Sequence, residues 1–92
     1  MAFAGARIII DGVVQGVGFR YWTFNTARKL NILGYVANLP DGSVEAVAEG
    51  ERGLIEEFIK AVKIGPTYSD VTNLSVEWYN QPRNYKEFTI KL

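Results

Sequence analysis

The residues best suited to chemistry lie in a glycine-containing segment, residues 12–20, that ends in an arginine. Gly16 and Gly18 allow the backbone to curl, so that successive N–H groups can point at one oxyanion. A helix beginning near Phe19 would add its uncapped N–H groups and the positive end of its dipole. Arg20 in the first helical turn opposes that dipole at a cost of about 0.3–1 kcal/mol. A bidentate contact with phosphate oxygens would remove the conflict, so the segment predicts a phosphate cradle.

The same segment has a simpler interpretation. Two glycines can serve only to make a tight connection, and an isolated exposed arginine is commonly a solvated surface residue, so the loop alone leaves both interpretations open. Two other phosphate-binding motifs are excluded. No Gly-Lys-Ser/Thr follows, so the segment is not a Walker loop, and Tyr21 stands where the dinucleotide fingerprint needs its third glycine.

Asn38 is the second candidate for chemistry. It ends a short β-prone stretch over residues 34–38 and comes directly before residues 39–42, whose proline and glycine predict a tight turn. Taken alone, Asn38 is a turn asparagine. If the carboxyl end of this strand and the loop at residues 12–20 lie on the same side of a sheet, the Asn38 amide comes beside the cradle. There it could hold an attacking water.

Hydrophobic periodicity supplies the elements that must position these groups. Alternation with a period of two, as in Ile8 and Ile10 against Arg7 and Asp11, predicts strands, and apolar residues three and four apart predict helices. The predicted strands cover residues 6–14, 34–38, 43–49, 71–79 and 87–92, and the predicted helices cover residues 19–30 and 51–64. This order predicts an α+β, ferredoxin-like split βαββαβ sandwich, with two helices on one face of a mainly antiparallel sheet and a short extra C-terminal strand. The sequence leaves the place of that last strand in the sheet open.

Composition sets further limits on the function. With 92 residues, 48% of them hydrophobic and 22% charged, the chain is expected to form one domain over residues 1–92. Ten basic residues offset ten acidic ones, and the net charge of +0 argues against a nucleic acid or an anionic membrane as the partner. The chain contains neither Cys nor His. Thiolate and histidine nucleophiles, and metal sites built on Cys or His, are therefore excluded.

Three further expectations follow from what the sequence lacks. Glu45 and Glu49 share one face of a predicted strand, but without a His, Cys or Asp partner they are weak metal ligands, so no metal and no cofactor are expected. The first residues lack the basic start and apolar run of a signal peptide, and no later stretch could span a bilayer. We therefore expect a cytoplasmic protein, and we expect a monomer.

Two long segments resemble the signatures of the acylphosphatase family. Residues 12–20 are similar to the first signature and residues 34–50 to the second, both without gaps, and the resemblance continues along the chain to residues 88–90. It implies a free-standing enzyme that hydrolyses small-molecule acyl phosphates and releases inorganic phosphate. It also implies a role for each site residue. The phosphoryl group would be gripped by the Arg20 side chain and by the main-chain amides of Gln15, Gly16, Val17, Gly18, Phe19 and Arg20. Asn38 would orient the nucleophilic water, and Thr23 matches a family threonine expected to support the loop.

The residue inventory agrees with that reaction. Phosphoryl transfer passes through a loose transition state, so positioning and charge stabilisation can supply most of the acceleration. A carboxylate leaves without protonation, whereas the alkoxide of a phosphate monoester normally needs a general acid, and the two segments contain no well-placed acid. We therefore predict in-line attack of water without a metal ion or a phosphoenzyme. Since amides and a guanidinium keep their charge between about pH 5 and 9, the rate should be nearly flat across neutrality.

A binding or regulatory module of the same architecture is the alternative to an enzyme. Residues 34–36 faintly echo the aromatic strand of RNA-recognition domains, but the preceding base and the following aromatics are missing. A domain that handles phosphate or carbamoyl phosphate, as in hydrogenase maturation proteins, is a second form of this alternative. The remaining aromatics are interpreted as packing residues rather than as a ligand box: Trp22, Phe24, Phe58, Trp78 and Phe88.

Overall fold

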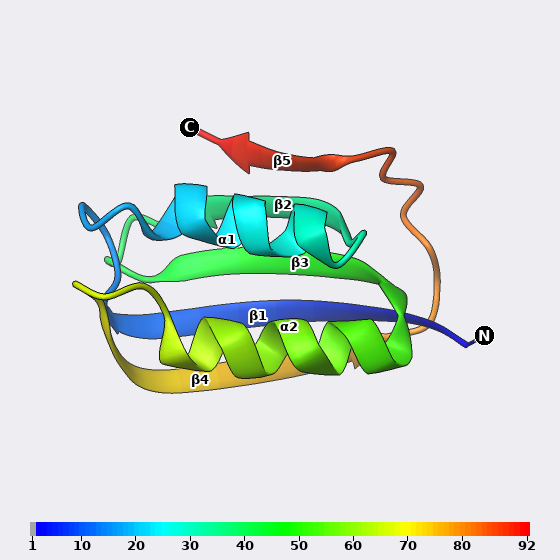
Figure 1. Ribbon diagram of the computed structural model, residues 1–92, viewed down its shortest axis with the longest axis horizontal. Helices are drawn as coiled ribbons and strands as arrows, with labels where there is room; N and C mark the ends of the chain where they lie inside the picture. Colours follow the sequence, from blue (N-terminus) through cyan, green and yellow to red (C-terminus); the bar gives the residue numbers. More distant parts are fainter. Residues whose placement is uncertain (1) are drawn as a thin grey trace.

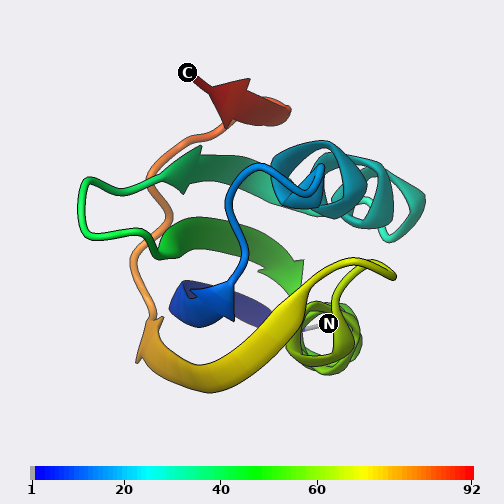
Figure 2. The same ribbon diagram turned by 90° about the vertical axis from the view of Figure 1, so that its left-hand side faces the viewer.

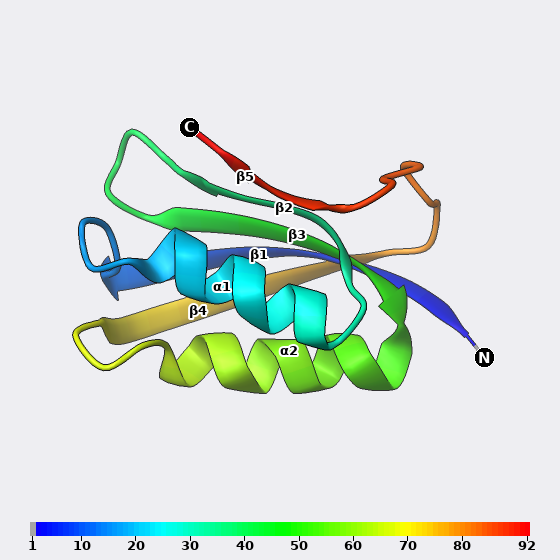
Figure 3. The ribbon, with the colours of Figure 1, turned by 45° about the horizontal axis from the view of Figure 1, so that its top comes forward.

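The computed structural model describes residues 2–92 and has two layers, a sheet and a pair of helices (Figure 1). Within these residues the elements are β1 (Phe3–Val13), α1 (Phe19–Lys29), β2 (Leu33–Asn38), β3 (Val44–Glu51), α2 (Arg52–Ile64), β4 (Asp70–Tyr79) and β5 (Phe88–Lys91). Both helices cover the same face of the sheet and run side by side across it (Figure 3). The ferredoxin-like α+β fold predicted from the sequence is confirmed.

The sheet has the strand order β4-β1-β3-β2-β5. β1 pairs antiparallel with both β3 and β4, β2 pairs antiparallel with β3, and β5 lies parallel to β2. The last strand, whose place was open, therefore forms an edge of the sheet beside β2. As a consequence β1, β2 and β5 all run in the same direction. Their carboxyl ends therefore lie together at one end of the strands.

The core lies between the helices and the sheet. Alternate residues of β1, among them Ile8 and Ile10, are fully buried and face the helices, as the period-two pattern predicts. From α2 the buried residues are Ile55, Phe58 and Val62, and from α1 they are Phe19, Thr23 and Ala27. The predicted apolar faces of both helices therefore pack on the sheet.

The ends of several elements differ from the prediction by one to three residues. β1 begins at Phe3 rather than at residue 6, because β3 extends to Glu51 and pairs with the start of β1. α2 begins at Arg52, since the Glu51 side chain caps the helix by accepting a hydrogen bond from the Gly53 N–H at 3.2 Å. Among residues 2–92, neither helix has the length and apolar character needed to cross a membrane.

The outer face of the sheet is partly covered by the connection from β4 to β5, residues 80–87. Figure 2 shows this connection passing along the side of the sheet opposite the helices. Beneath it, Glu49 is only 3% exposed and accepts hydrogen bonds from the Tyr79 hydroxyl at 2.6 Å and the Arg83 N–H at 3.0 Å. Tyr85 also meets the Tyr35 ring edge to face. These contacts hold the connection in place, and the connection in turn delivers β5 to its edge position.

Candidate active site

The candidate site lies at the end of the sheet where the carboxyl ends of β1, β2 and β5 lie together. The β1–α1 loop, the end of β2 with Asn38, and the end of the chain all lie on this side of the molecule, which faces the viewer in Figure 2. Asn38 shares a sheet face with Val36, two residues earlier, whose side chain is fully buried under the helices. The amide is therefore on the same face as the loop that leads into α1. The predicted proximity of these two segments is what the structure shows.

The loop conformation explains its two glycines. Gly16 and Gly18 have φ values of 75° and 76°, in the left-handed region that residues with a side chain rarely adopt. A Cβ at either position would meet no atom within 4 Å. Backbone conformation rather than lack of space therefore calls for glycine here. Left-handed residues of this kind occur in anion-binding nests, in which successive N–H groups surround one anion.

The amino end of α1 is left without a side-chain cap. Its N-cap residue is Gly18, which has no side chain to accept from the first turn, and that turn contains no acidic residue. Its first N–H groups consequently have no partner within the helix, and the positive end of the dipole is not offset by a carboxylate. This end of α1 can accept an anion.

Arg20 is held from the far end of the chain. Its Nη1 donates a hydrogen bond to the main-chain carbonyl of Lys91, 3.0 Å away and 71 positions later in the sequence. A guanidinium has five N–H groups in a rigid fork, so this bond fixes the side chain and leaves most of its donors for other acceptors. The contact depends on β5 lying beside β2.

Gln15 joins the loop to the β2–β3 turn. Its side-chain Nε2 donates to the carbonyls of Leu39 and Ser43, both at 2.8 Å. The same turn is closed by a hydrogen bond from the Gly42 N–H to the Leu39 carbonyl at 3.1 Å, and Gly42 has a φ of 97°, as the Pro-Asp-Gly pattern predicts. Gln15 therefore sets the distance between the loop and the strand that ends in Asn38.

The carboxylate of Asp41 in this turn accepts hydrogen bonds from within the turn. It accepts from the Ser43 hydroxyl at 2.6 Å and from the Ser43 N–H at 3.0 Å. These hydrogen bonds, chiefly the one from the hydroxyl, lower the pKa of Asp41. The two hydrogen bonds favour the ionised carboxylate and stiffen the turn next to the site.

Asn38 brings an unusual group to the site. Its Oδ1 is buried, and it has no hydrogen-bond partner among the residues that the structure describes. An unpaired buried carbonyl oxygen costs about 1–3 kcal/mol, so such groups are uncommon and call for an explanation. A small donor molecule in the adjacent space would supply the missing hydrogen.

These groups surround a hollow with a volume of about 310 Å³. Its lining consists of Val14, Gly16, Gly18, Phe19, Arg20, Tyr21, Asn38, Ile90 and Leu92. Among the lining side chains, only that of Arg20 carries a charge. The arrangement can bind a tetrahedral oxyanion between the helix end and the guanidinium, with the Asn38 amide beside it.

The other predicted site residues lie around this hollow rather than in its lining. The Gln15 side chain turns to the β2–β3 turn, and Val17 packs against the hydrophobic core. Thr23 is fully buried one turn along α1, and its hydroxyl has no hydrogen-bond partner in residues 2–92. Any support that Thr23 gives to the loop therefore comes from packing, and this role stays a prediction.

Three features of the site were not predicted from the sequence. The Lys91 contact was missed because a main-chain carbonyl leaves no trace in residue type. Ile90 and Leu92 were missed because the place of the last strand was open. Tyr21 directly follows Arg20 at the start of a helix, and its 65% exposure is a signal that becomes visible only in the structure.

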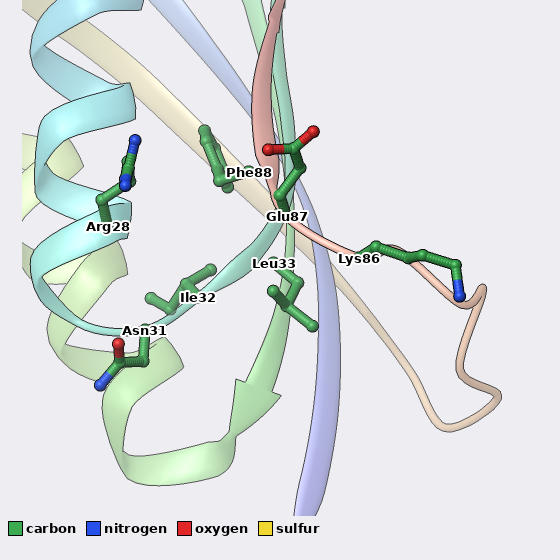
Figure 4. A pocket seen from close by; sticks show the side chains of 7 residues that line it. All are labelled: Arg28, Asn31, Ile32, Leu33, Lys86, Glu87 and Phe88. Carbon is green, nitrogen blue, oxygen red and sulfur yellow. The ribbon is translucent and has the colours of Figure 1, made fainter.

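A second hollow, of about 240 Å³, lies at the other end of α1 (Figure 4). Arg28 and Glu87 stand on either side of Phe88, and the Lys86 side chain points away from the other labelled residues. This end of α1 presents carbonyl groups and the negative end of the dipole, which disfavours an anion. The first hollow is therefore better suited to an oxyanion than the second.

Two of the three glutamates of β3, Glu45 and Glu49, form hydrogen bonds on the outer face of the sheet. Glu45 accepts from Arg7 Nε at 2.6 Å and from the Tyr35 hydroxyl at 2.9 Å, while Glu49 holds Tyr79 and Arg83. Burial, together with the hydrogen bond and charge of Glu45, raises the pKa of Tyr35 to about 12. Within residues 2–92, no group of three or more Asp or Glu side chains is placed to hold a metal ion together.

Comparison with known proteins decides what this loop, arginine and amide belong to. A sequence model of the acylphosphatase family matches residues 6–90. The chain belongs to the acylphosphatase family. An acylphosphatase of Thermotoga maritima is 47% identical over 85 residues, which cover 92% of this chain and 93% of that protein. The resemblance predicted from the two segments is confirmed, and the chain is a hydrolase with acylphosphatase function.

Solved structures agree with this assignment. The crystal structure of acylphosphatase from Bacillus subtilis has a TM-score of 0.95 and 42% identity, and the match covers 97% of this chain and 99% of that chain. Full-length HypF, in its phosphate- and nucleotide-bound form, matches with a TM-score of 0.89 and 37% identity over 97% of this chain but only 12% of its own. These matches do not favour the binding-module alternative.

Proposed function

We propose that this acylphosphatase grips the phosphoryl group of an acyl phosphate with the main-chain N–H groups of residues 15–20 and the Arg20 guanidinium, while Asn38 orients the attacking water. One observation carries the proposal. The buried, unpartnered Oδ1 of Asn38 borders the same hollow as the uncapped end of α1 and Arg20. An acceptor for a water and a site for an oxyanion therefore share one space.

Arg20 and the amides would stabilise the charge that spreads over the phosphoryl oxygens in the transition state. Phosphoryl transfer needs little covalent help from the protein, so fixed donors at the right places account for most of the acceleration. The Lys91 carbonyl holds the guanidinium before substrate arrives. The other N–H groups of the Arg20 guanidinium are then available for a bidentate contact with phosphate oxygens.

Asn38 would position the water rather than deprotonate it. Its Oδ1 can accept one water hydrogen, which leaves a water lone pair free to face the phosphorus. A loose transition state demands little nucleophilic strength, so orientation of the water is the larger contribution. The carboxylate product leaves opposite to the water and needs no general acid. We expect no metal ion or cofactor to take part, because Arg20 and the amides already supply positive charge.

The setting of the reaction is part of the same proposal. We expect the substrate to be a small-molecule acyl phosphate and the product to be inorganic phosphate, with the protein acting as a monomer in the cytoplasm. The balanced net charge of +0 supports a protein that works without a nucleic-acid partner.

Hydrolysis of benzoyl phosphate in ¹⁸O-labelled water tests the proposal. Attack on phosphorus puts one labelled oxygen into the phosphate and none into the benzoate, and the rate is expected to be unchanged after exhaustive chelation. Label in the benzoate would show attack on the carbonyl carbon instead. Activity that is lost on chelation and restored by magnesium would contradict the metal-free mechanism, and an inert folded protein would point to a binding module.

A further inference from the structure

The hollow beside Arg20 and Asn38 is larger than its proposed phosphate chemistry requires. Its volume of about 310 Å³ equals that of roughly ten waters at about 30 Å³ each, which exceeds the space of one phosphoryl group and one water. The polar groups account for part of the lining only. Tyr21, Ile90 and Leu92 line it as well, together with the buried side chains of Val14 and Phe19. This apolar part is not explained by phosphate binding.

We infer that Tyr21, Ile90 and Leu92 form a binding surface for the acyl group of the substrate, and that it selects acyl phosphates whose acyl group is apolar and uncharged. The inference rests on the proposed function, since it takes the phosphoryl group to lie in the cradle. The acyl group is covalently attached to that phosphoryl group, so it must lie within a bond or two of it. No other occupant of the hollow is constrained in this way.

The direction of attack places the acyl group on the exposed side. The Asn38 Oδ1 that would hold the water is buried, and in-line displacement requires the leaving group on the opposite side of the phosphorus. Tyr21 is 65% exposed and Leu92 is fully exposed, so these two side chains stand where the hollow opens to solvent. The acyl group would therefore leave past them.

Tyr21 has the properties of a prepared aromatic platform. Its ring stacks on that of Phe24, with centroids 6.4 Å apart and an interplanar angle of 22°. The Arg28 guanidinium also lies over the Phe24 ring, 5.5 Å from its centroid. A ring held in this way loses little conformational freedom when a second apolar group packs against it.

The lack of a second charged group sets the selectivity. Among the side chains that line the hollow, only that of Arg20 is charged, and it faces the phosphoryl oxygens in the proposed complex. A carboxylate on the acyl group would lose water against apolar side chains without gaining a partner, which is costly. An aromatic or aliphatic acyl group would instead bury surface that is exposed in the free enzyme.

The test compares binding and turnover of ligands that share the phosphoryl end. Acetylphosphonate and benzoylphosphonate, which are not hydrolysed, give dissociation constants by calorimetry, and acetyl, benzoyl and succinyl phosphate give kcat/KM. Ratios between ligands are compared between proteins, so that the intrinsic reactivity of each substrate cancels. In Tyr21→Ala, the benzoyl preference over acetyl should fall by roughly five- to tenfold in both measurements. In Tyr21→Phe the ratio should return to within about twofold of the wild type.

A second substitution tests the charge selectivity. Leu92→Lys places an ammonium group at the mouth of the hollow with little risk to folding, because Leu92 is fully exposed. It should raise the ratio of succinyl to acetyl phosphate turnover by several-fold. The matched control is Phe3→Ala, an exposed aromatic at the opposite end of β1, for which both ratios should equal those of the wild type.

The outcomes separate this inference from the proposed function. Unchanged ratios in Tyr21→Ala and Leu92→Lys, with turnover of acyl phosphates intact, would overturn the acyl surface and leave the phosphate mechanism standing. A wild-type protein that hydrolyses none of the three substrates would overturn the proposed function. If it also bound the two phosphonates equally, the acyl surface would be overturned on binding evidence alone.

Discussion

The guanidinium of Arg20, at the start of α1, is tied to the main-chain carbonyl of Lys91, at the end of β5, by a hydrogen bond of 3.0 Å. This bond joins the first helix to the last strand. It gives the C-terminal strand a role in the site, because β5 supplies the group that fixes the arginine. The parallel pairing of β5 with β2 brings that carbonyl to the right edge of the sheet.

Truncation at the C-terminus tests this relationship. Removing Leu92 alone converts the Lys91 carbonyl into a terminal carboxylate, which still accepts from Arg20, whereas removing residues 91–92 takes the acceptor away. We expect kcat/KM for acetyl phosphate to fall by about tenfold or more between the two truncated proteins, since a mispositioned group costs heavily in the transition state. Both truncated proteins lack Leu92, so the loss of any contact between Leu92 and substrate affects both equally and does not contribute to the difference between them. Equal activity in the two folded proteins would contradict a role for the carbonyl.

Gln15 should contribute to stability through its side chain. Gln15→Ala leaves the Leu39 and Ser43 carbonyls without their donor, so the free energy of unfolding should fall by about 1–3 kcal/mol in urea titrations. Gln15→Glu places a carboxylate against the same two carbonyls. Protonation of this carboxylate would relieve the repulsion. The free energy of unfolding of Gln15→Glu should therefore be closer to that of the wild type at pH 4 than at pH 7. A Gln15→Ala protein as stable as the wild type would show that the loop is held by other contacts.

The rate of hydrolysis should depend little on pH around neutrality. The proposed groups are amides and a guanidinium, which do not titrate between about pH 5 and 9. Near them, hydrogen bonds from Ser43 lower the pKa of Asp41, so this carboxylate also keeps its charge in that range. A profile of kcat against pH measured with benzoyl phosphate is expected to be nearly flat. A bell centred near pH 7 would show that a titrating group takes part.

Stability should fall at alkaline pH because of two tyrosines on the outer face. Burial and Glu45 raise the pKa of Tyr35 to about 12, and burial and Glu49 raise the pKa of Tyr79 as well. In the unfolded chain the pKa of tyrosine is about 10. The stability that the two protonated tyrosines contribute is therefore fully present below about pH 10 and is lost as the pH rises toward 12. The difference in unfolding free energy between the wild type and the Tyr35→Phe/Tyr79→Phe double variant should shrink across that interval. A constant difference would mean that neither phenol is linked to folding.

Much of the site could be predicted because its signals are local. Gly16 and Gly18 mark a backbone conformation, and residues 39–42 mark a turn, so each leaves a trace in residue type. The proximity of Asn38 to the loop then follows from strand direction, which the order of elements determines. These parts of the site follow from local residue preferences and from the order of the strands and helices.

The parts that could not be predicted depend on long-range packing. β5 has four residues, and two buried or half-buried apolar side chains do not specify which strand it will join. Glu49 alternates as an outward residue, yet it is buried because residues 80–87 return across it. The Lys91 contact uses a carbonyl that every residue possesses. In each case the information lies in the arrangement of distant segments rather than in the residues themselves.

Steady-state hydrolysis of benzoyl phosphate by the wild type, Arg20→Ala, Asn38→Ala and the control Lys29→Ala tests the central claim most directly. Lys29 is an exposed residue in the last turn of the same helix, so it controls for the loss of a positive charge from α1. With folding checked by circular dichroism, turnover should fall by about a hundredfold or more in Arg20→Ala and Asn38→Ala and remain near the wild type in Lys29→Ala. Folded Arg20→Ala or Asn38→Ala protein with turnover close to the wild type would contradict the proposed mechanism.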